Sequence, residues 1–506
     1  MPEKIKKYLN IEFFLIFAIL LLALTIRVFR IDQTLNFFYD QGRDALVIWE
    51  LIYSPHKLFL IGPTTGLAGV FRGPFYYYLI APFYWLGRGN PLYPEVFLVL
   101  TSIAALWLMY VLAKEIGGKT SAIITLLLGS FSFEIIYASR WLSNPTPMLL
   151  LSMLLVWSLF KIYDGKKNYW ILLSLILGLS FFSFGSSGEL FYFPAVAFFA
   201  VWQFFFTKRG IKKIPNVKIL IASVVVFLLT FAPLFIFNLR HGNILENGVL
   251  GQMGSGKSFG IPTWQFVLDR LNLVWTYFSS LIAHSPYAKE QVIVAMPSLT
   301  GIYFLPRIIK NDKAKIILIL LVSVVAGSVF YVGNYGNFYQ YYLTGYYLIF
   351  LLLAGVALSE IFKNNWLGKI AVVLFLYFFL TQNWSWIKPY VYTTGLEPDT
   401  IVYADQAKAI DWVYQNADGH DFNVDEYVPP VITYEYDYLF KWLGTEKYHK
   451  LPDASQVPLL FTLYEVDPPN PQRLQAWLDR QKGIGKVVKE ETFGGLTVQM
   501  RIRIDR

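Results

Sequence analysis

The sequence predicts a polytopic α-helical membrane protein that carries a small α/β domain at its C-terminal end. Apolar residues make up 56% of the 506 residues and charged residues only 15%, whereas typical soluble proteins are about 45–50% apolar and about 25% charged. Apolar runs long enough to cross the hydrocarbon layer, about 20 residues each, recur throughout residues 1–383. Residues 384–506 instead contain 13 basic and 18 acidic residues, which indicates a water-soluble domain.

Eleven apolar runs are predicted to be transmembrane helices. They are residues 11–31, 93–113, 119–137, 146–162, 168–185, 188–206, 218–238, 289–306, 314–333, 340–361 and 367–383. A twelfth run, 74–88, is interrupted by Pro82 and is too short to cross, so we expect it to lie on the membrane surface. The first run is predicted to be a span and not a cleaved signal peptide, because it is too long and no small-residue cleavage site follows it.

Basic residues fix the direction of these spans. With the N-terminus inside and residues 74–88 on the surface, five groups of Lys and Arg fall in the inner loops, and the short outer loops hold only Arg140. Because inner loops carry the basic excess of membrane proteins, the N-terminus is predicted to be cytoplasmic. Loops 32–92 and 239–288 and the C-terminal domain are then extracytoplasmic. The net charge of +9 accordingly indicates membrane topology and not a nucleic-acid surface.

The C-terminal domain is predicted to alternate helices and strands. Its expected elements are a helix at 401–414, a strand at 422–428, an aromatic run at 434–442, a strand at 459–466, a helix capped by Asn470, and a hairpin at 487–504. Gly494 and Gly495 interrupt the hairpin at its turn. The domain contains no catalytic motif.

Several classes of site are excluded by composition and spacing. The chain has no Cys, so it has no disulfides, thiol nucleophile or Cys-based metal site. Its five His residues show no metal-ligand spacing, and no zinc-protease or serine-hydrolase motif occurs. We therefore predict no metal site from the sequence.

Residues 251–258 match the P-loop pattern letter for letter but lack its context. A P-loop needs a buried strand before it and a helix directly after it, so that the loop amides face the phosphates. Residues 244–250 make a poor strand because they contain Glu246, Asn247 and Gly248, and Pro262 follows the motif. We expect a flexible loop here and no ATP binding.

The richest candidate site follows the first span. Asp40 can cap the helix that starts there, Asp44 lies one turn further along the same face, and Arg43 stands beside it. One interpretation is a capped surface helix with an ion pair. The other is a carboxylate held near the membrane surface as a base or metal ligand, with Arg43 directed at an anion.

Further polar residues lie at the outer ends of other spans. Arg72 stands at the same membrane depth as Arg43, where a lipid-borne phosphate would lie. Arg27 and Arg30, one turn apart in the first span, are explained by snorkelling to the interface. The other outer-end residues are Arg140, Asn144, Glu189, Asn238, Arg240, His241, Tyr339, Gln340, Tyr341 and Tyr342. Each is typical of an interface on its own, but their gathering on one side indicates a site.

This layout resembles the C-type glycosyltransferase (GT-C) superfamily. The closest likeness is to the family 39-like branch, which contains dolichyl-phosphate-mannose–protein mannosyltransferases and lipid A aminoarabinose transferases. That branch has an acidic motif in its first outer loop, which residues 38–43 match in Asp40 and Arg43 but not in Gln41, where Glu is common. Residues 72–75, Arg-Gly-Pro-Phe, resemble the family's Lys-Pro-Pro-Leu segment.

Other positions extend the resemblance over roughly residues 1–383. Asn144 stands where the second outer loop of the family has an acidic residue. Residues 238–241 and 339–342 resemble further motifs of bacterial and archaeal members. The resemblance implies a GT-C fold of about 11 transmembrane helices.

The resemblance also implies an activity, namely transfer of a sugar, with inversion, from a polyprenyl-phosphate-linked donor to an acceptor on the outer face. The acceptor would be a protein, a lipid or a cell-envelope glycan. Arg43 and Arg72 would bind the donor phosphate, and Asp40 would remove the acceptor proton or hold a divalent cation that does so. Asp44 would orient Arg43, and residues 339–342 would stack on the sugar. No other cofactor is implied.

Two other functions stay open from the sequence. A transporter or flippase of lipid-linked saccharides would need polar groups along a path through the membrane centre, yet charged residues cluster at span ends, with Glu134 a modest exception. A cell-envelope scaffold with a passive membrane anchor would not need eleven spans.

Overall fold

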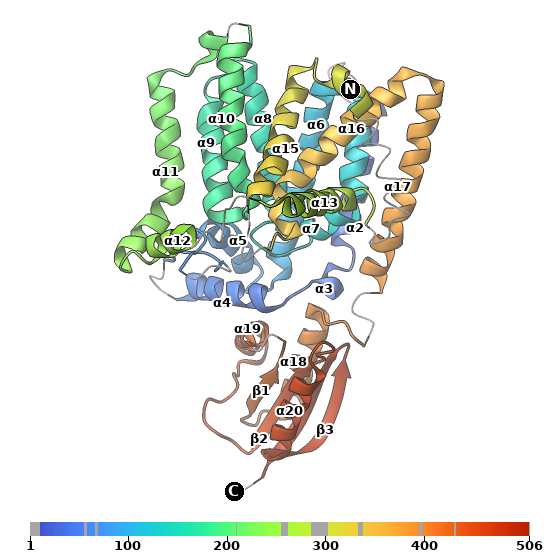
Figure 1. Ribbon diagram of the computed structural model, residues 1–506. Coiled ribbons are helices and arrows are strands. Elements are labelled where there is room, and N and C mark those ends of the chain that lie inside the picture. The colour runs from blue at the N-terminus through green and yellow to red at the C-terminus, as the bar shows by residue number, and fades with distance from the viewer. Residues whose placement is uncertain are drawn as a thin grey trace, which may run out of the picture.

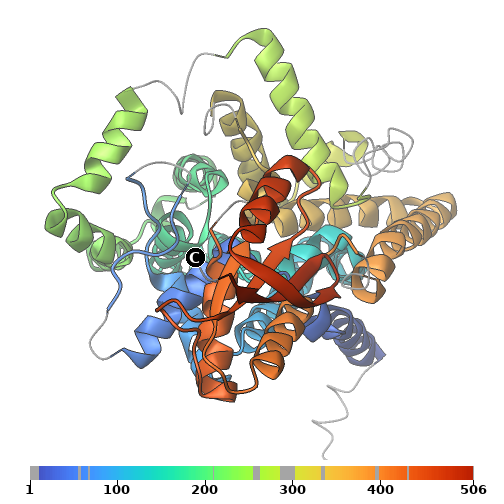
Figure 2. The ribbon, with the colours of Figure 1, turned by 90° about the horizontal axis from the view of Figure 1, so that it is seen from below.

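The computed structural model describes residues 11–54, 58–65, 69–208, 210–254, 262–284, 302–331, 337–393, 398–429 and 432–504. A bundle of helices forms one end of the molecule, and a four-stranded sheet with its helices forms the other (Figure 1). Seen from the sheet end, the sheet domain covers the middle of the bundle (Figure 2). The predicted fold class, a polytopic helical protein with a small C-terminal α/β domain, is confirmed.

Seven helices within the described residues are long and apolar enough to cross a membrane. They are α2 (Ile11–Val28), α6 (Leu92–Phe131), Gly188–Phe206, α11 (Val217–Arg240), α15 (Asp312–Phe330), Gln340–Asn364 and α17 (Trp366–Tyr392). Two of these are composite, built from η2 (Gly188–Phe191), α10 (Tyr192–Val201) and η3 (Trp202–Phe206), and from η5 (Gln340–Leu343) and α16 (Thr344–Asn364). Shorter apolar helices are α8 (Met148–Tyr163) and α9 (Tyr169–Leu179) with η1 (Ser180–Phe184).

Ten of the eleven predicted spans coincide with these helices. The predicted spans 93–113 and 119–137 are the two parts of α6, which breaks at Gly118, where φ is 75°, and continues into α7 (Phe133–Ser139). Only glycine adopts such a φ without strain. The predicted span 289–306 lies largely outside the described residues, so the number eleven stays a prediction.

Short helices gather at the end of the bundle that faces the sheet domain. They are α3 (Ile31–Thr34), α4 (Tyr39–Tyr53), α5 (Phe75–Leu86), α12 (Ile244–Gly254) and α13 (Trp264–Ser280). α4, α12 and α13 lie across this end (Figure 1). α5, at 12 residues, is too short to cross, as predicted, and its Trp85 and Leu86 are exposed. Its residues Tyr76, Tyr77, Ile80 and Tyr84 are buried, because α5 packs against both α4 and α6.

The sequence interpretation of two regions is corrected. Residues 244–250, expected as a poor strand before a loop, belong to helix α12, which runs to Gly254. Residues 255–258 of the P-loop-like segment lie outside the described residues.

Arg27 does not snorkel but is fully buried, and it donates hydrogen bonds to the carbonyls of Gly129 and Ser130. These carbonyls lie in the last turn of α6, where no helical N–H reaches them. Arg30 likewise donates to the carbonyl of Val391 at the end of α17.

The C-terminal domain has the predicted elements in the predicted order. They are α18 (Tyr403–Ala417), β1 (Asn423–Tyr427), α19 (Tyr434–Leu443), η6 (Gly444–Tyr448), β2 (Leu459–Glu465), α20 (Pro471–Lys482), β3 (Gly485–Phe493) and β4 (Leu496–Arg503). The sheet order is β1-β2-β4-β3, with β1 and β2 parallel and the other pairs antiparallel. A parallel pair needs a crossover connection, which α19 supplies. The aromatic run at 434–442 is a helix because its buried residues recur at helical spacing.

Outside these elements, residues 210–213 form a short 3-10 turn, η4 (Gly210–Lys213). Buried apolar side chains of the helix bundle and of the C-terminal domain form one continuous cluster. The C-terminal domain therefore packs firmly on the end of the bundle that carries α4.

Candidate functional site

Helix α4 carries the predicted acidic residues, but Asp40 is not its cap. The cap residue is Phe38, whose backbone N–H donates to Gln41 Oε1 at 3.1 Å. Asp40 lies in the first turn, where a negative charge is favoured by the helix dipole. Since Gln41 satisfies the helix start, the Asp40 carboxylate is left facing water, with 59% of its side chain exposed.

Arg43 bridges the two aspartates of this helix. Its Nη1 lies 2.8 Å from Asp40 Oδ1, and its Nη2 and Nε lie 2.8 and 3.0 Å from Asp44 Oδ1. Asp44 also accepts a hydrogen bond from the Tyr77 hydroxyl at 2.9 Å, and Arg43 Nη1 donates to Thr64 Oγ1 at 3.1 Å. The buried Asp44 therefore fixes the guanidinium, while Asp40 stays at the water-facing edge.

Burial and neighbouring charges shift the pKa values of Asp44 and Arg43. Burial raises the pKa of Asp44 to about 6, although the charge and hydrogen bonds of Arg43 and the hydroxyl of Tyr77 oppose the shift. Burial lowers the pKa of Arg43, but the charges of Asp44 and Asp40 outweigh it and the net shift is upward. Arg43 is therefore a permanent cation, and above about pH 6 the buried Asp44 beside it is ionised.

Arg72 lies on a turn that reaches the other side of the site. Thr64 and Phe71 form a β-bridge, and Arg72 N–H donates to the Pro63 carbonyl at 3.1 Å. The next residue, Gly73, donates to the Phe182 carbonyl and lies so close to Ser183 that a Cβ would clash. Arg72 Nη1 donates to the Phe181 carbonyl at 3.3 Å, so the turn is seated on η1.

Arg72 faces Glu189 and a group of tyrosines. Its guanidinium lies in the neighbourhood of the Glu189 carboxyl group and of the phenols of Tyr331, Tyr341 and Tyr342. Glu189 is buried and accepts from the backbone N–H groups of Ser186, at 2.6 Å, and Gly345, at 3.3 Å. It therefore ties η2 to the start of α16 and lies beside Arg72.

The two predicted donor-binding arginines flank one turn without touching. Thr64 binds Arg43 and pairs with Phe71, the residue before Arg72. No direct contact between the two guanidinium groups is seen among the described residues. The Tyr341 phenol lies near both Asp40 and Arg72, so one tyrosine is close to both parts of the site.

The segment 339–342 divides into exposed and buried members. Tyr339 and Tyr341 are 44% and 38% exposed, and their rings stack with centroids 5.7 Å apart. Tyr342 is buried, and Gln340 Nε2 donates to Ser280 Oγ at 3.1 Å. The two exposed rings are thus available to a ligand, whereas Gln340 joins its segment to α13.

Four predicted residues are placed elsewhere. Arg140 is buried, donates to Thr34 Oγ1 and lies 5.0 Å from the Tyr390 ring centroid. Asn144 Nδ2 donates to the Phe184 carbonyl at 3.0 Å and so supports η1 from behind. Arg240 is exposed at the end of α11, and His241 stacks on Phe237 with its Nδ1 2.8 Å from the Phe237 carbonyl. No contact of Arg140, Arg240 or His241 with Asp40 is seen among the described residues.

Arg270 on α13 is a candidate that the sequence reasoning missed. Its side chain is only 3% exposed and lies between the rings of Phe266 and Phe338, with centroids 5.0 and 4.9 Å from Cζ. Nη2 donates to the Tyr331 carbonyl at 3.4 Å, but Nε and Nη1 have no partner among the described residues. The sequence feature that could have identified Arg270 is that it is the one Arg among the apolar positions of residues 264–280.

Arg270 and Arg72 approach the same tyrosine. The Tyr331 phenol lies near both guanidinium groups and shares a 2.7 Å hydrogen bond with Ser187 Oγ. Two buried donors of Arg270 without an acceptor are energetically costly unless a ligand supplies one. The pair therefore forms a candidate anion site beside Glu189.

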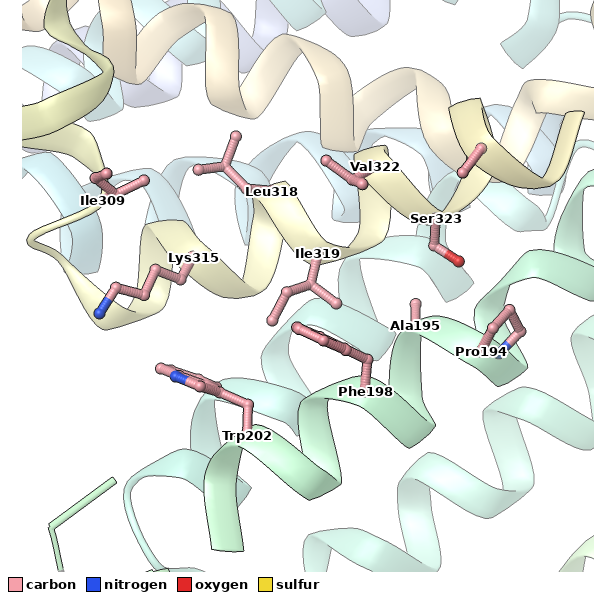
Figure 3. A pocket seen from close by; sticks show the side chains of 11 residues that line it. Pro194, Ala195, Phe198, Trp202, Ile309, Lys315, Leu318, Ile319, Val322 and Ser323 are labelled. Atoms are coloured by element: carbon pink, nitrogen blue, oxygen red, sulfur yellow. The ribbon is translucent and has the colours of Figure 1, made fainter. Parts of the chain in front are cut away.

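An apolar groove leads along the bundle toward this anion site. It encloses about 440 Å³ between α10–η3 and α15, with Phe198 and Trp202 on one side and Leu318 and Ile319 on the other, and Lys315 lies at one end (Figure 3). Ser323 lies toward the other end and donates to the Phe191 carbonyl at 2.8 Å.

Phe191 connects this groove to the tyrosine beside the arginines, because its ring contacts the Tyr331 ring, with centroids 6.4 Å apart. Phe191 thus lies between the Ser323 end of the groove and Tyr331. Within the described part of the chain, no three His, Asp or Glu residues are arranged to hold a metal ion, so a divalent cation at Asp40 stays a prediction.

Comparisons with known proteins agree with the resemblance seen in the sequence. Residues 71–237 match the family model of dolichyl-phosphate-mannose-protein mannosyltransferases. An uncharacterized protein of Aquifex aeolicus is 26% identical over 206 residues, which is 38% of this chain and 40% of that protein. The match thus spans about two fifths of the relative's length.

Two solved structures share the fold over nearly the whole chain. ArnT from Cupriavidus metallidurans bound to undecaprenyl phosphate is 12% identical, with a TM-score of 0.58 and coverage of 96% of this chain and 97% of that one. Its apo state gives a TM-score of 0.59 at 10% identity, with the same coverage. At this identity, the comparison establishes the architecture alone.

Proposed function

We propose that this chain, a multi-pass membrane protein with the GT-C fold of the protein mannosyltransferase and ArnT-like branch, is an inverting glycosyltransferase. It transfers a sugar from a polyprenyl-phosphate-linked donor to a hydroxyl acceptor at the outer face of the membrane. The observation that carries the proposal is the placement of Asp40. Its exposed carboxylate is paired with Arg43 at the end of the bundle that also carries Arg72 and Arg270, and an apolar groove runs between α10–η3 and α15 toward the opposite end.

The groove and the arginines match the two parts of such a donor. A polyprenyl tail is apolar and lies in the bilayer, which suits the lining of Phe198, Trp202 and Ile319. The phosphate carries negative charge, and Arg72 and the two unpaired donors of Arg270 supply a cationic pair for it. The undecaprenyl phosphate in the ArnT structure supports this class of ligand.

The reaction needs little from the protein beyond charge and one base. The acceptor oxygen forms a bond to the anomeric carbon as the bond from that carbon to the phosphate oxygen breaks. The electron pair of the broken bond remains on the phosphate, where arginine stabilises the charge. The acceptor proton passes to Asp40. Attack from the side opposite the phosphate inverts the anomeric carbon.

Asp40 is better suited to be the base than Asp44. Asp44 is 6% exposed and already accepts hydrogen bonds from Arg43 and Tyr77. Within the described part of the chain, Asp40 has one ion pair, with Arg43, and it is open to water. A base must come within hydrogen-bond reach of the proton it removes, which only the exposed carboxylate allows.

The proposed orientation puts this end of the bundle outside the cell. α4, α12, α13 and the C-terminal domain lie at the same end (Figure 1). The inner loops hold an ion-pair network in which Lys161 and Lys313 bind Glu115, and Lys313 also binds Asp164. Basic residues of this kind favour the cytoplasmic side.

Proteoliposomes test the proposal directly. Purified protein is reconstituted with a panel of polyprenyl-phosphate hexoses, and the release of polyprenyl phosphate is measured with and without added acceptors. Release that depends on the protein and on acceptor supports transfer. Movement of intact donor across the bilayer, without any release, would instead identify a flippase.

A further inference from the structure

The C-terminal domain reaches the residues of the proposed transfer site through helix α19. Gly42, between Gln41 and Arg43 on α4, faces the backbone of Tyr434 and Glu435 at the start of α19. A Cβ at Gly42 would overlap the backbone N and Cα of Glu435. The two helices therefore touch backbone to backbone at the turn of α4 that bears Asp40 and Arg43.

This contact is held from several sides. Tyr403 N–H donates to the Leu35 carbonyl, and Gln406 Nε2 donates to the Phe37 carbonyl, both at 2.9 Å. At the other end of α4, Lys441 Nζ lies 2.7 Å from Glu50 Oε1. Trp442 Nε1 and the Tyr438 hydroxyl donate to the carbonyls of residues 88 and 89. The start of α19 is thus fixed relative to Asp40.

The close approach brings Tyr434 of the C-terminal domain against Tyr39. Their ring centroids are 5.0 Å apart with the planes tilted by 58°, and both side chains are half-buried. Tyr39 precedes Asp40, and its ring centroid lies 5.9 Å from Arg43 Cζ. The exposed pair Tyr339 and Tyr341 lies between Asp40 and Arg72, since Tyr341 is near both groups. Tyr39 and Tyr434 therefore form a second aromatic pair near Asp40, contributed by α4 and α19.

We propose that Tyr434 is a positioning residue on the acceptor side of the site, and that the acceptor is a saccharide. This inference rests on the proposed transferase function. A sugar ring has an apolar C–H face that fits the tyrosine pair, and a hydroxyl on its rim would reach Asp40. That hydroxyl oxygen bonds to the anomeric carbon of the donor, its proton passes to Asp40, and the phosphate leaves with the electron pair. A Ser or Thr side chain offers no such face.

Kinetics with defined acceptors test the inference. Full-length protein in nanodiscs is given the polyprenyl-phosphate hexose that it cleaves, and either a panel of methyl glycosides or Ser- and Thr-containing peptides. We expect methyl glycosides to accept the sugar. Tyr434→Ala should raise the acceptor KM about tenfold, as loss of an aromatic contact would, and leave the donor KM within about twofold. Tyr434→Phe should restore the acceptor KM, since the ring is kept.

Tyr427→Ala is the matched control, because Tyr427 also makes a ring contact in this domain, but with Trp477 of α20 and not with a residue of α4. Its acceptor KM should equal that of the wild type. An unchanged acceptor KM in Tyr434→Ala, with wild-type melting temperature, would overturn the inference, as would transfer to peptides alone. If the wild type releases no polyprenyl phosphate with any donor or acceptor, the proposed function itself fails, and the inference fails with it.

Discussion

Arg43 and Asp44 are joined side by side, with both Nε and Nη2 of the guanidinium directed at one carboxylate oxygen, Oδ1, at 3.0 and 2.8 Å. This pair is mostly buried, while the remaining Nη1 reaches the exposed Asp40. Asp40 and Asp44, one helix turn apart, thus have different roles. Asp44 holds the cation, and the cation orients the carboxylate that we assign as the base.

The pH dependence of transfer should report on Asp44. Burial raises the pKa of Asp44 to about 6. When the pH is lowered through about 6, this carboxylate becomes neutral and its ion pair with Arg43 is lost. We expect kcat/KM to fall below about pH 6. The Asp44→Asn variant should be less active at pH 7 and should lack this inflection, which a pH–rate profile checks. A wild-type profile that is flat between pH 5 and 7 would contradict the assignment.

Arg270 should determine donor affinity. Arg270→Ala removes the two buried donors that have no protein partner in the described structure, and we expect the apparent donor KM to rise at least tenfold, since a charge-assisted bond contributes about 1.5–3 kcal/mol. Arg270→Lys should recover only part of the affinity, because an ammonium cannot bind two phosphate oxygens in a fixed plane. Arg240→Ala, which removes an exposed arginine at the end of α11, is the control and should change nothing.

The groove should be selective for long lipid chains. Ala326→Phe places a large ring in the groove between α10 and α15. We expect the donor KM to rise for a donor with an undecaprenyl chain and to change less for one with a short, water-soluble chain. Leu228→Phe on the exposed face of α11 is the control. Equal effects on both donors would place the tail elsewhere.

Gly42 should be indispensable for packing of the C-terminal domain. Gly42→Ala forces a Cβ into the backbone of Glu435, and overpacking of this kind typically costs about 1–3 kcal/mol. We expect a lower melting temperature and reduced transfer, measured on the same preparation. Gly251→Ala has no atom within 4 Å of the new Cβ and should behave as wild type. A Gly42→Ala protein of unchanged stability and activity would show that the interface tolerates the methyl group.

The elements of the fold were largely predictable because their signals are local. Apolar runs of sufficient length identified ten described spans, and Asn470, Pro471, Gly494 and Gly495 marked the elements of the C-terminal domain. Such signals depend only on residues that are close together in the sequence. They can therefore be recognised without knowledge of tertiary contacts.

The site was only partly predictable because its geometry depends on distant contacts. Residues 40–44 could be found from their spacing on one helix. The partners of Arg72 on η1, the aromatic sandwich around Arg270 and the contact of Gly42 with Glu435 each join segments more than 60 residues apart. Arg27 was misread for the same reason, since the carbonyls that it binds belong to another helix.

The central claim, that the carboxylate of Asp40 removes the acceptor proton, is tested most directly by Asp40→Asn in the proteoliposome assay. The amide keeps the size of the side chain but is not a base, so we predict that release of polyprenyl phosphate falls at least about 100-fold, while donor binding and melting temperature stay near those of the wild type. Asp32→Asn, at another exposed aspartate on the same side, should retain full activity. Wild-type transfer rates in Asp40→Asn would contradict the account.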